Sequence, residues 1–293
     1  MVRTPGARDP LRLLALGVVG VVLLALVVVS TGALALRGDH STDRPRGGTD
    51  AGEGTTAATR PQADRVPDEA LLPDLASLPA DELGIRVRAD GQRVLRFAAV
   101  LANTGAGPLQ VDPVPVVDCP AGQRLVVQTV HLDGDGDGDF DRERDRARTQ
   151  LPGGCMLFHR SHDHWHFDGS AGYALTAVDD STPIVERSKV SFCLRDSERN
   201  PAAAERHARA YPSCARDRRQ GISVGWADRY DATLAGQRLR LPLSMADGAY
   251  CLRLSADPHG RLTESDEANN ASAVAIRITG AEVERDPTRS CTT

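Results

Sequence analysis

Beyond about residue 68, hydrophobic residues recur at every second position over short stretches, which is the repeat of a β-strand with one buried face. Gly, Pro and Asp separate these stretches, as they do in antiparallel sandwiches. The stretches are Leu83–Phe97, Ala99–Asn103, Arg124–Leu132, Trp165–Val178, Lys189–Leu194, Ala249–Ala256 and Ser272–Ile278. Only Pro201–Arg209 favours a helix, with Asn200 as its N-cap. The pattern predicts an all-β fold, an antiparallel β-sandwich with long loops and little helix.

The N-terminal part has a different pattern. Residues 14–36 are almost continuously apolar and follow three arginines, which is typical of an export signal or a single membrane span. The arginines favour a cytoplasmic N-terminus, with the rest of the chain outside. Ala33-Leu34-Ala35 offers a cleavage site, so a secreted protein and one anchored at the extracellular face of the membrane are both open. We expect a signal peptide or anchor over 1–36, a disordered linker over 37–67, a folded domain over 68–282 and a tail over 283–293.

Six cysteines lie in the part predicted to be exported, where disulfides form. Of the many pairings that six cysteines allow, the set we favour is Cys119–Cys155, Cys193–Cys214 and Cys251–Cys291. The net charge of −5 gives no basic footprint for nucleic acid, so we expect no such partner.

Lys189 is the only lysine among the 35 lysine and arginine residues. Arginine therefore serves at almost every position where this chain needs a cation. The one lysine indicates a position that needs a primary amine. A guanidinium stays protonated and is a poor nucleophile. A solvent-exposed lysine retained by chance is the alternative.

Four of the eight histidines fall in the segment His159-x-x-His162-x-His164-x-His166. If this segment is a strand, the last three imidazoles share one face at intervals of about 7 Å, and the aromatic residues beside them face the core. Nitrogen ligation without cysteine suits Cu²⁺, Zn²⁺ or Ni²⁺, of which Cu²⁺ binds most tightly. Zinc is the main alternative, because three histidines and a water form its catalytic geometry.

A third motif is acidic. Asp133-Gly-Asp135-Gly-Asp137-Gly-Asp139 is similar to the start of an EF-hand loop. Arg144 stands at the twelfth position, where an EF-hand requires a bidentate glutamate. A weak calcium site and a solvated acidic turn are therefore equally open.

The histidine segment resembles the copper-binding segment of lysyl oxidases, whose pattern is H-x-x-H-x-H-x-H. The similarity continues in the same order, with similar spacing, over about residues 70–280. The segments that carry it are His159–His166, Lys189–Asp196, Gln220–Gly225, Asp228–Tyr230 and Glu264–Asn270. The resemblance implies the catalytic-domain fold of lysyl oxidases, with an Ig-like C-terminal part.

The resemblance also implies roles for individual residues. The positions that match the copper ligands are His162, His164 and His166. Lys189 and Tyr230 match the pair that condenses to the cofactor lysine tyrosylquinone, so the single lysine falls where the family requires an amine. Asp228 is a candidate general base, because a spacing of two puts it on the same strand face as Tyr230. The implied activity is copper-dependent oxidation of a primary amine, peptidyl lysine or a small amine, by O₂. The products are an aldehyde, H₂O₂ and ammonia.

A second metal follows from the same resemblance. The positions that match the family's calcium ligands are Asp74, the carbonyl of Leu75, Glu264, Asp266, Asn269 and Asn270. Oxygen donors in this number suit Ca²⁺, which would tie the start of the domain to its last loop. The same turn motif also occurs in Ig-like surface modules. Two departures, Ser161 and Trp226 in place of cysteines found in animal members, imply a different disulfide pattern.

Two other classes of function stay open. A non-enzymatic, exported surface module that binds copper or calcium would leave Lys189 and Tyr230 unmodified. A zinc hydrolase would need a carboxylate base beside the histidines, and this segment offers only Asp163 and Asp168.

Overall fold

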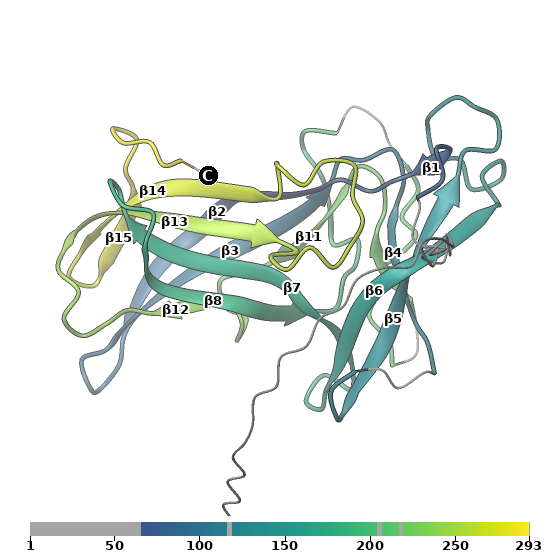
Figure 1. Ribbon diagram of the computed structural model, residues 1–293. Coiled ribbons are helices and arrows are strands. Elements are labelled where there is room, and N and C mark those ends of the chain that lie inside the picture. The colour runs from purple at the N-terminus through teal and green to yellow at the C-terminus, as the bar shows by residue number, and fades with distance from the viewer. Residues whose placement is uncertain (1–65, 116–118, 204–206, 217–218, 293) are drawn as a thin grey trace, which may run out of the picture. The chain divides into compact units, whose positions relative to one another are not determined.

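The structure is a computed structural model that describes residues 66–115, 119–203, 207–216 and 219–292, with the main chain only at residues 188 and 189. Two antiparallel sheets face each other (Figure 1), and the described residues contain no α-helix. The predicted all-β, antiparallel fold is therefore confirmed. Residues 1–36, the predicted signal or anchor, lie outside the described residues, as does almost all of the predicted linker. Within the described part, no helix has the length and apolar character needed to cross a membrane.

The larger sheet has the strand order β10-β4-β5-β6-β7-β13-β14-β15, with β1 beside β5 and β8 beside β7. Its strands are β1 (Ala70–Leu71), β4 (Leu109–Pro113), β5 (Gln123–Leu132), β6 (Arg148–His159), β7 (His164–Ala177), β8 (Pro183–Phe192), β10 (Gln220–Ile222), β13 (Gly248–Ala256), β14 (Ala271–Thr279) and β15 (Glu282–Arg285). The smaller sheet is centred on β3, which pairs with β2, β11 and β12. Its strands are β2 (Leu75–Val87), β3 (Arg93–Asn103), β9 (Glu198–Arg199), β11 (Trp226–Tyr230) and β12 (Arg238–Arg240).

The core lies between the two sheets. Alternate residues of β3, Leu95, Phe97 and Leu101, are almost fully buried, and they belong to one cluster with Leu175 of β7. The ring of Phe97 meets that of Tyr173 on β7 edge to face, with centroids 4.9 Å apart. Burial of each large apolar side chain contributes about 1.5–3 kcal/mol to folding. The alternation of apolar residues along the chain thus has its expected physical basis, a buried face on each strand.

All three favoured disulfides are present, namely Cys119–Cys155, Cys193–Cys214 and Cys251–Cys291. Each closes a loop of 21 to 40 residues. A disulfide that closes a loop of this length stabilises a fold by about 3–4 kcal/mol, because it lowers the entropy of the unfolded chain. The last bond ties the chain beyond β15 to β13.

The helix predicted over Pro201–Arg209 is wrong for the described residues of that segment, 201–203 and 207–209. The Asn200 side chain accepts a hydrogen bond from the Ala202 N–H (3.0 Å), and the Asn200 carbonyl accepts one from Ala203 (3.1 Å). Asparagine side chains close local turns with the same hydrogen bonds that cap helices. The N-cap signal was real, but it begins a turn.

Candidate metal centre and active site

The histidine segment forms the tight connection of the β6–β7 hairpin. β6 ends at His159 and β7 begins at His164, and the two strands pair over only four residues each. The N–H groups of His162 and Asp163 both donate to the His159 carbonyl, at 3.0 Å. Asp163 has a φ of +56°, a left-handed conformation that aspartate tolerates better than most residues. The expectation of three histidines on one strand was therefore wrong for His162, which lies in the turn.

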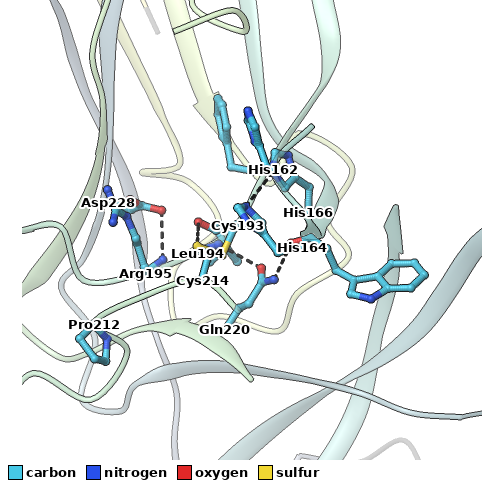
Figure 2. The surroundings of a disulfide bond; sticks show 12 residues. His162, His164, His166, Cys193, Leu194, Arg195, Pro212, Cys214, Gln220 and Asp228 are labelled. Atoms are coloured by element: carbon cyan, nitrogen blue, oxygen red, sulfur yellow. Dashed lines mark hydrogen bonds between the residues drawn. A yellow bond between two sulfur atoms is a disulfide. The ribbon is translucent and has the colours of Figure 1, made fainter. Parts of the chain in front are cut away.

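The turn brings the ring nitrogens closer together than a straight strand would. His166 Nε2 lies 3.2 Å from His162 Nδ1 and 3.2 Å from His164 Nε2. Figure 2 shows the three rings converging. A strand alone would separate successive side chains of one face by about 7 Å. Because His166 Nε2 lies close to a ring nitrogen of each of the other two histidines, this arrangement can hold a single ion.

The surroundings of His166 prepare its Nε2 for a metal. Its other ring nitrogen, Nδ1, lies 3.0 Å from the Ser191 carbonyl oxygen on β8, which fixes the ring and places the proton on Nδ1. Burial lowers the pKa of His166 to about 4, and it also lowers the pKa of His164. A neutral imidazole keeps the lone pair that a metal needs. The donor set therefore fits a copper or zinc ion.

A fourth histidine belongs to the same group. The ring of His159 stacks on those of His162 and His166, with centroids 4.0 and 4.7 Å apart. Its Nδ1 lies 3.1 Å from the Ser161 hydroxyl. His159 was part of the motif but was not among the predicted ligands. The short hairpin turn, which the spacing alone did not indicate, brings it against His162 and His166.

The histidines line one wall of a cavity of about 670 Å³. Its other walls come from β8, the segment after β8, β11 and the loop before β12. The lining residues outside the histidine group are Leu157, Arg187, Val190, Ser191, Phe192, Cys193, Arg195, Ser213, Cys214, Tyr230, Leu234, Ala235 and Gly236. The structure thus brings Tyr230 and the three predicted copper ligands to the same cavity.

Tyr230, on β11, is held from two sides. Its ring stacks on Phe192, with centroids 3.6 Å apart. Its hydroxyl donates to the Cys193 carbonyl (3.1 Å) and to the Asp228 carboxylate. Asp228 also accepts the N–H of Arg195 at 3.1 Å, while its second oxygen, Oδ1, has no partner. The same-face spacing of residues 228 and 230 therefore brings carboxylate and phenol into contact.

Burial sets the protonation of this pair. Asp228 is completely buried, and burial raises its pKa to about 7, against the lowering effect of the Tyr230 hydroxyl. Burial likewise raises the pKa of Tyr230 well above its usual value. A carboxyl group with a pKa near neutrality can exchange a proton with its neighbour at physiological pH.

Lys189 lies on β8, and the chain on both sides of it belongs to the cavity wall. Arg187 precedes it and Val190 follows it, and both line the cavity. The main chain of β8 therefore carries the single lysine past the same cavity as Tyr230 and the histidines.

The Cys193–Cys214 disulfide lies between the histidines and Asp228 in Figure 2. Its sulfur atoms lie within 4.8 Å of a ring nitrogen of His164. Gln220 fastens this region, because its amide donates to the Trp165 carbonyl (2.6 Å) and accepts the Leu194 N–H (3.1 Å). The histidine hairpin and the segment that orients Tyr230 are thus joined to a common support.

Comparison with known protein families matches residues 141–287, half of the 293-residue chain, to the family described as "Lysyl oxidase". The matched range contains the histidine segment, Lys189 and Tyr230. The chain belongs to the lysyl oxidase family. Individual relatives agree: the chain is 32% identical to protein-lysine 6-oxidase of Gallus gallus over 124 residues, which cover 42% of this chain and 28% of that protein.

Two further relatives delimit the similarity. Protein-lysine 6-oxidase of Sus scrofa is 32% identical over 124 residues, which cover 42% of this chain and 47% of that protein. Lysyl oxidase homolog 3A of Danio rerio is 29% identical over 137 residues, which cover 46% of this chain and 18% of that protein. The chain therefore matches less than half the length of these lysyl oxidases.

The other predicted metal site of this lysyl oxidase family member lies at the start of β2. The N–H of Leu75 donates to Glu264 at 2.6 Å, and the Asn269 amide donates to Asp74 at 2.8 Å. The Asn270 amide donates to Glu264 at 2.9 Å. Burial raises the pKa of Glu264 to about 8. The structure brings these predicted ligands together, although they are far apart in the sequence.

Three further predicted ligands, Asp266, Asn269 and Asn270, lie in the Glu264–Asn270 loop. Asp266 accepts the N–H of Ala268 at 2.8 Å, within its own turn. The side-chain oxygens of Asn269 and Asn270 are buried and have no hydrogen-bond partner. Buried amide oxygens without a partner are costly and are suitable donors to a hard cation such as Ca²⁺.

The carboxylates of the acidic loop after β5 are engaged in part by its own arginine and by its own N–H groups. Arg144 pairs with Asp135 and with Asp137 (3.4 Å). Asp133 accepts the N–H groups of Gly136 and Gly138. Arg144 occupies the position at which an EF-hand has a glutamate. The carboxylates of the loop accept its hydrogen bonds and those of main-chain N–H groups within the turn.

The carboxylates that a zinc hydrolase would use are engaged elsewhere. Asp163 pairs with Arg216, and Asp168 pairs with Arg261 at 3.3 Å. No Asp or Glu is among the described residues that line the cavity. The described part of the site therefore offers little support for a hydrolytic base.

Proposed function

We propose that this chain is a copper-dependent amine oxidase of the lysyl oxidase type. It would convert primary amines, peptidyl lysine among them, to aldehydes with O₂ and release H₂O₂ and ammonia. The observation that carries the proposal is the cavity that three converging imidazoles share with Tyr230. Membership of the family supports the same chemistry.

His162, His164 and His166 are the residues that would hold copper in this proposal. Their nitrogens converge, and the bond of His166 Nδ1 to Ser191 leaves Nε2 free. The ion would supply redox chemistry with O₂, and a quinone made from Lys189 and Tyr230 would supply the carbonyl group that reacts with the substrate amine. The chain's contribution would be to hold the tyrosine and the amine in one cavity, with the lysine on a strand that lines it.

Asp228 is the proton acceptor in this scheme. Its Oδ2 already accepts the hydroxyl proton of Tyr230 in a hydrogen bond, and its pKa of about 7 makes it a base near neutral pH. It would take the phenolic proton when Tyr230 is oxidised, and it is the candidate base for the carbon next to the substrate amine. The stack on Phe192 keeps the Tyr230 ring in place during this transfer.

The support for a role of Lys189 is its position in the chain and not a side-chain contact. It is the only lysine of the chain and lies on the strand that lines the cavity. As the neutral amine, after the loss of its proton, it would add to the ring derived from Tyr230.

Calcium is the second metal of the proposal. The ligands would be the oxygens of Asp74, the carbonyl of Leu75, Glu264, Asp266, Asn269 and Asn270. The buried, unpartnered amide oxygens and the buried Glu264 support this assignment. The role would be structural, because the loop that contains these ligands is hydrogen-bonded to the start of β2 through Glu264 and to the end of β13 through Asn270.

We also propose that the protein is exported. Three disulfides suit an oxidising compartment. Whether residues 14–36 anchor the chain at the extracellular face of the membrane or are cleaved from a secreted protein is a proposal that depends on the sequence alone.

The deciding experiment is mass spectrometry of the full chain after loading with copper in air. A cross-linked peptide containing Lys189 and Tyr230, quinone absorbance and H₂O₂ release with a primary amine are expected. The matched controls are Lys189→Arg, which keeps the charge, Tyr230→Phe, which keeps the ring, and protein kept free of metal. Copper binding with separate, intact Lys189 and Tyr230 peptides would contradict the oxidase and favour a non-enzymatic metal-binding module.

A further inference from the structure

The charge of the active-site cavity limits the amines that it can accept. Two arginines, Arg187 and Arg195, line it, and no described lining residue is acidic. Alkylamines have a pKa near 10.4 and arrive as cations at neutral pH. A cavity with this lining repels a bare diamine or polyamine unless the substrate brings negative charge of its own.

Neither arginine is neutralised by a neighbouring carboxylate. Arg187 is half-buried and donates to the Gly236 carbonyl (2.7 Å) and to the Arg238 carbonyl (3.4 Å). Arg195 is exposed, and neither it nor Arg187 takes part in the ion pairs between described residues. By contrast, ten other described arginines each pair with an aspartate or glutamate, for example Arg216 with Asp163. Both cavity arginines therefore keep charge available for a ligand.

The two arginines lie on opposite sides of the reacting groups along the chain. Arg187 is on β8 before Lys189, and Arg195 follows the strand end beside Cys193 and the Tyr230 hydroxyl. Along β8, the main-chain positions of Arg187 and Phe192 are about 16 Å apart, at roughly 3.3 Å per residue. Arg195 lies three residues further along the chain, so a peptide with acidic groups at separate positions suits the two guanidinium groups.

We propose that the preferred substrate is a peptidyl lysine with acidic residues on both sides of it, whose carboxylates pair with Arg187 and Arg195. This inference rests on the proposed oxidase function and names its substrate class. The acidic side chains neutralise the cavity and bring the lysine to its centre, while polyamines and lysine-rich peptides are disfavoured. Since the net charge of the whole chain is −5, the selectivity arises from the local lining rather than from the overall charge.

A second role for Arg195 needs to be separated from this one. Its charge acts on the buried Asp228–Tyr230 pair, where it opposes the dominant effect of burial on the pKa of both groups. Loss of that effect would change turnover by the same factor for every substrate. Loss of substrate recognition would change the ratio between an acidic and a neutral peptide.

The test compares two blocked pentapeptides with a central lysine, one with glutamate at both ends and one with glutamine. The full-length, copper-loaded protein is expected to show a kcat/KM about 5- to 10-fold higher for the acidic peptide at low salt, falling toward parity at high salt. Arg195→Gln is expected to reduce the ratio to about 2 to 3, and Arg187→Gln to act similarly. Arg88→Gln, which removes an exposed arginine from the turn after β2, is the control and should leave the ratio unchanged.

Equal kcat/KM for the two peptides in the unaltered protein, or a ratio that survives Arg195→Gln, would overturn the proposal while leaving the oxidase intact. Absence of H₂O₂ with every amine would instead overturn the oxidase. In that case the same peptide pair with norleucine in place of lysine gives the answer by fluorescence anisotropy. Tighter binding of the acidic peptide, lost in Arg195→Gln, would support the recognition site, and equal binding would remove it.

Discussion

The histidine site and the Glu264–Asn270 loop are built from different donors, and their donors are brought together in different ways. The first uses neutral nitrogens from one hairpin, and its rings already converge at 3.2 Å. The second uses oxygens from chain segments 189 residues apart, around a buried carboxyl group. The nitrogen site is formed by local structure, whereas the oxygen site depends on the whole domain and contains Glu264, whose pKa is raised to about 8 by burial. Removing a ligand should therefore affect chemistry at the first site and stability at the second.

The largest effect is expected for Asp228→Asn. The amide keeps the size of the side chain but cannot take the proton of Tyr230, so quinone formation should slow by about 100- to 10,000-fold, the range for loss of a general base. The measurement is the growth of quinone absorbance after copper is added in air. Asp231→Asn, an exposed change just beyond β11, is the control. A normal rate in Asp228→Asn would exclude this residue as the base.

His162→Ala should weaken copper binding by at least about 100-fold, because it removes one of three converging donors. His162 is exposed in the turn, so the fold should tolerate its loss. Copper affinity is measured by competition with a chelator, and His259→Ala provides the loss of an exposed histidine outside the cluster. Unchanged affinity would show that the metal lies elsewhere. Calcium-dependent stability should stay normal in this variant, which tests the independence of the two sites.

Glu264→Gln should act on stability instead. In the unaltered protein, calcium at 100 times its Kd should add about 2.7 kcal/mol to the free energy of unfolding, and the variant should lose this gain. Without calcium the variant should be at least as stable as the parent, since the buried carboxyl group is costly when charged. Urea unfolding with and without calcium measures both. Asp135→Asn in the acidic loop should keep the full gain, and a loss there would transfer the calcium site to that loop.

The smallest effect is a pH dependence of stability that belongs to Asp228. Its pKa is about 7 in the folded state and 3.8 in the reference state, so the folded state holds the proton more tightly. The contribution of Asp228 to stability should therefore fall as pH rises from about 4 to 7 and should level off above that range. In metal-free protein it is measured as the difference in unfolding free energy between the parent and Asp228→Asn, because other buried carboxyl groups, such as Glu264, titrate in both proteins. A parallel pH profile in both proteins would contradict the assigned protonation.

The fold could be predicted to the extent that its strands have one buried face. β5, β7, β13 and β14 agree with their alternating stretches to within a few residues. β6 was missed; it contains Pro152, Gly153 and Gly154, residue types that are uncommon inside strands. In the structure Gly154 has a φ of +85°, near the register shift between β5 and β6. A Cβ at Gly153 would lie 2.9 Å from the Gln128 nitrogen. These glycines form an irregularity within the strand.

The candidate site was predictable residue by residue but not in its geometry. The histidine motif, the single lysine and the spacing of Asp228 and Tyr230 all point to groups that lie at or beside one cavity. The hairpin turn at His162 was not predictable, because it depends on a left-handed Asp163. His159, Arg187 and Arg195 were not predicted as site residues either, because their place at the site depends on tertiary contacts that the sequence does not show.

The Cys193–Cys214 bond also sets an order of assembly. In a reducing compartment these sulfurs would be thiols within 4.8 Å of the His164 ring, and thiolates are strong ligands for copper. Copper that arrived early would meet a mixed sulfur and nitrogen site, and the Cys193 carbonyl would lose the restraint that orients Tyr230. Formation of this disulfide before metal loading would therefore keep sulfur ligands out of the candidate copper site.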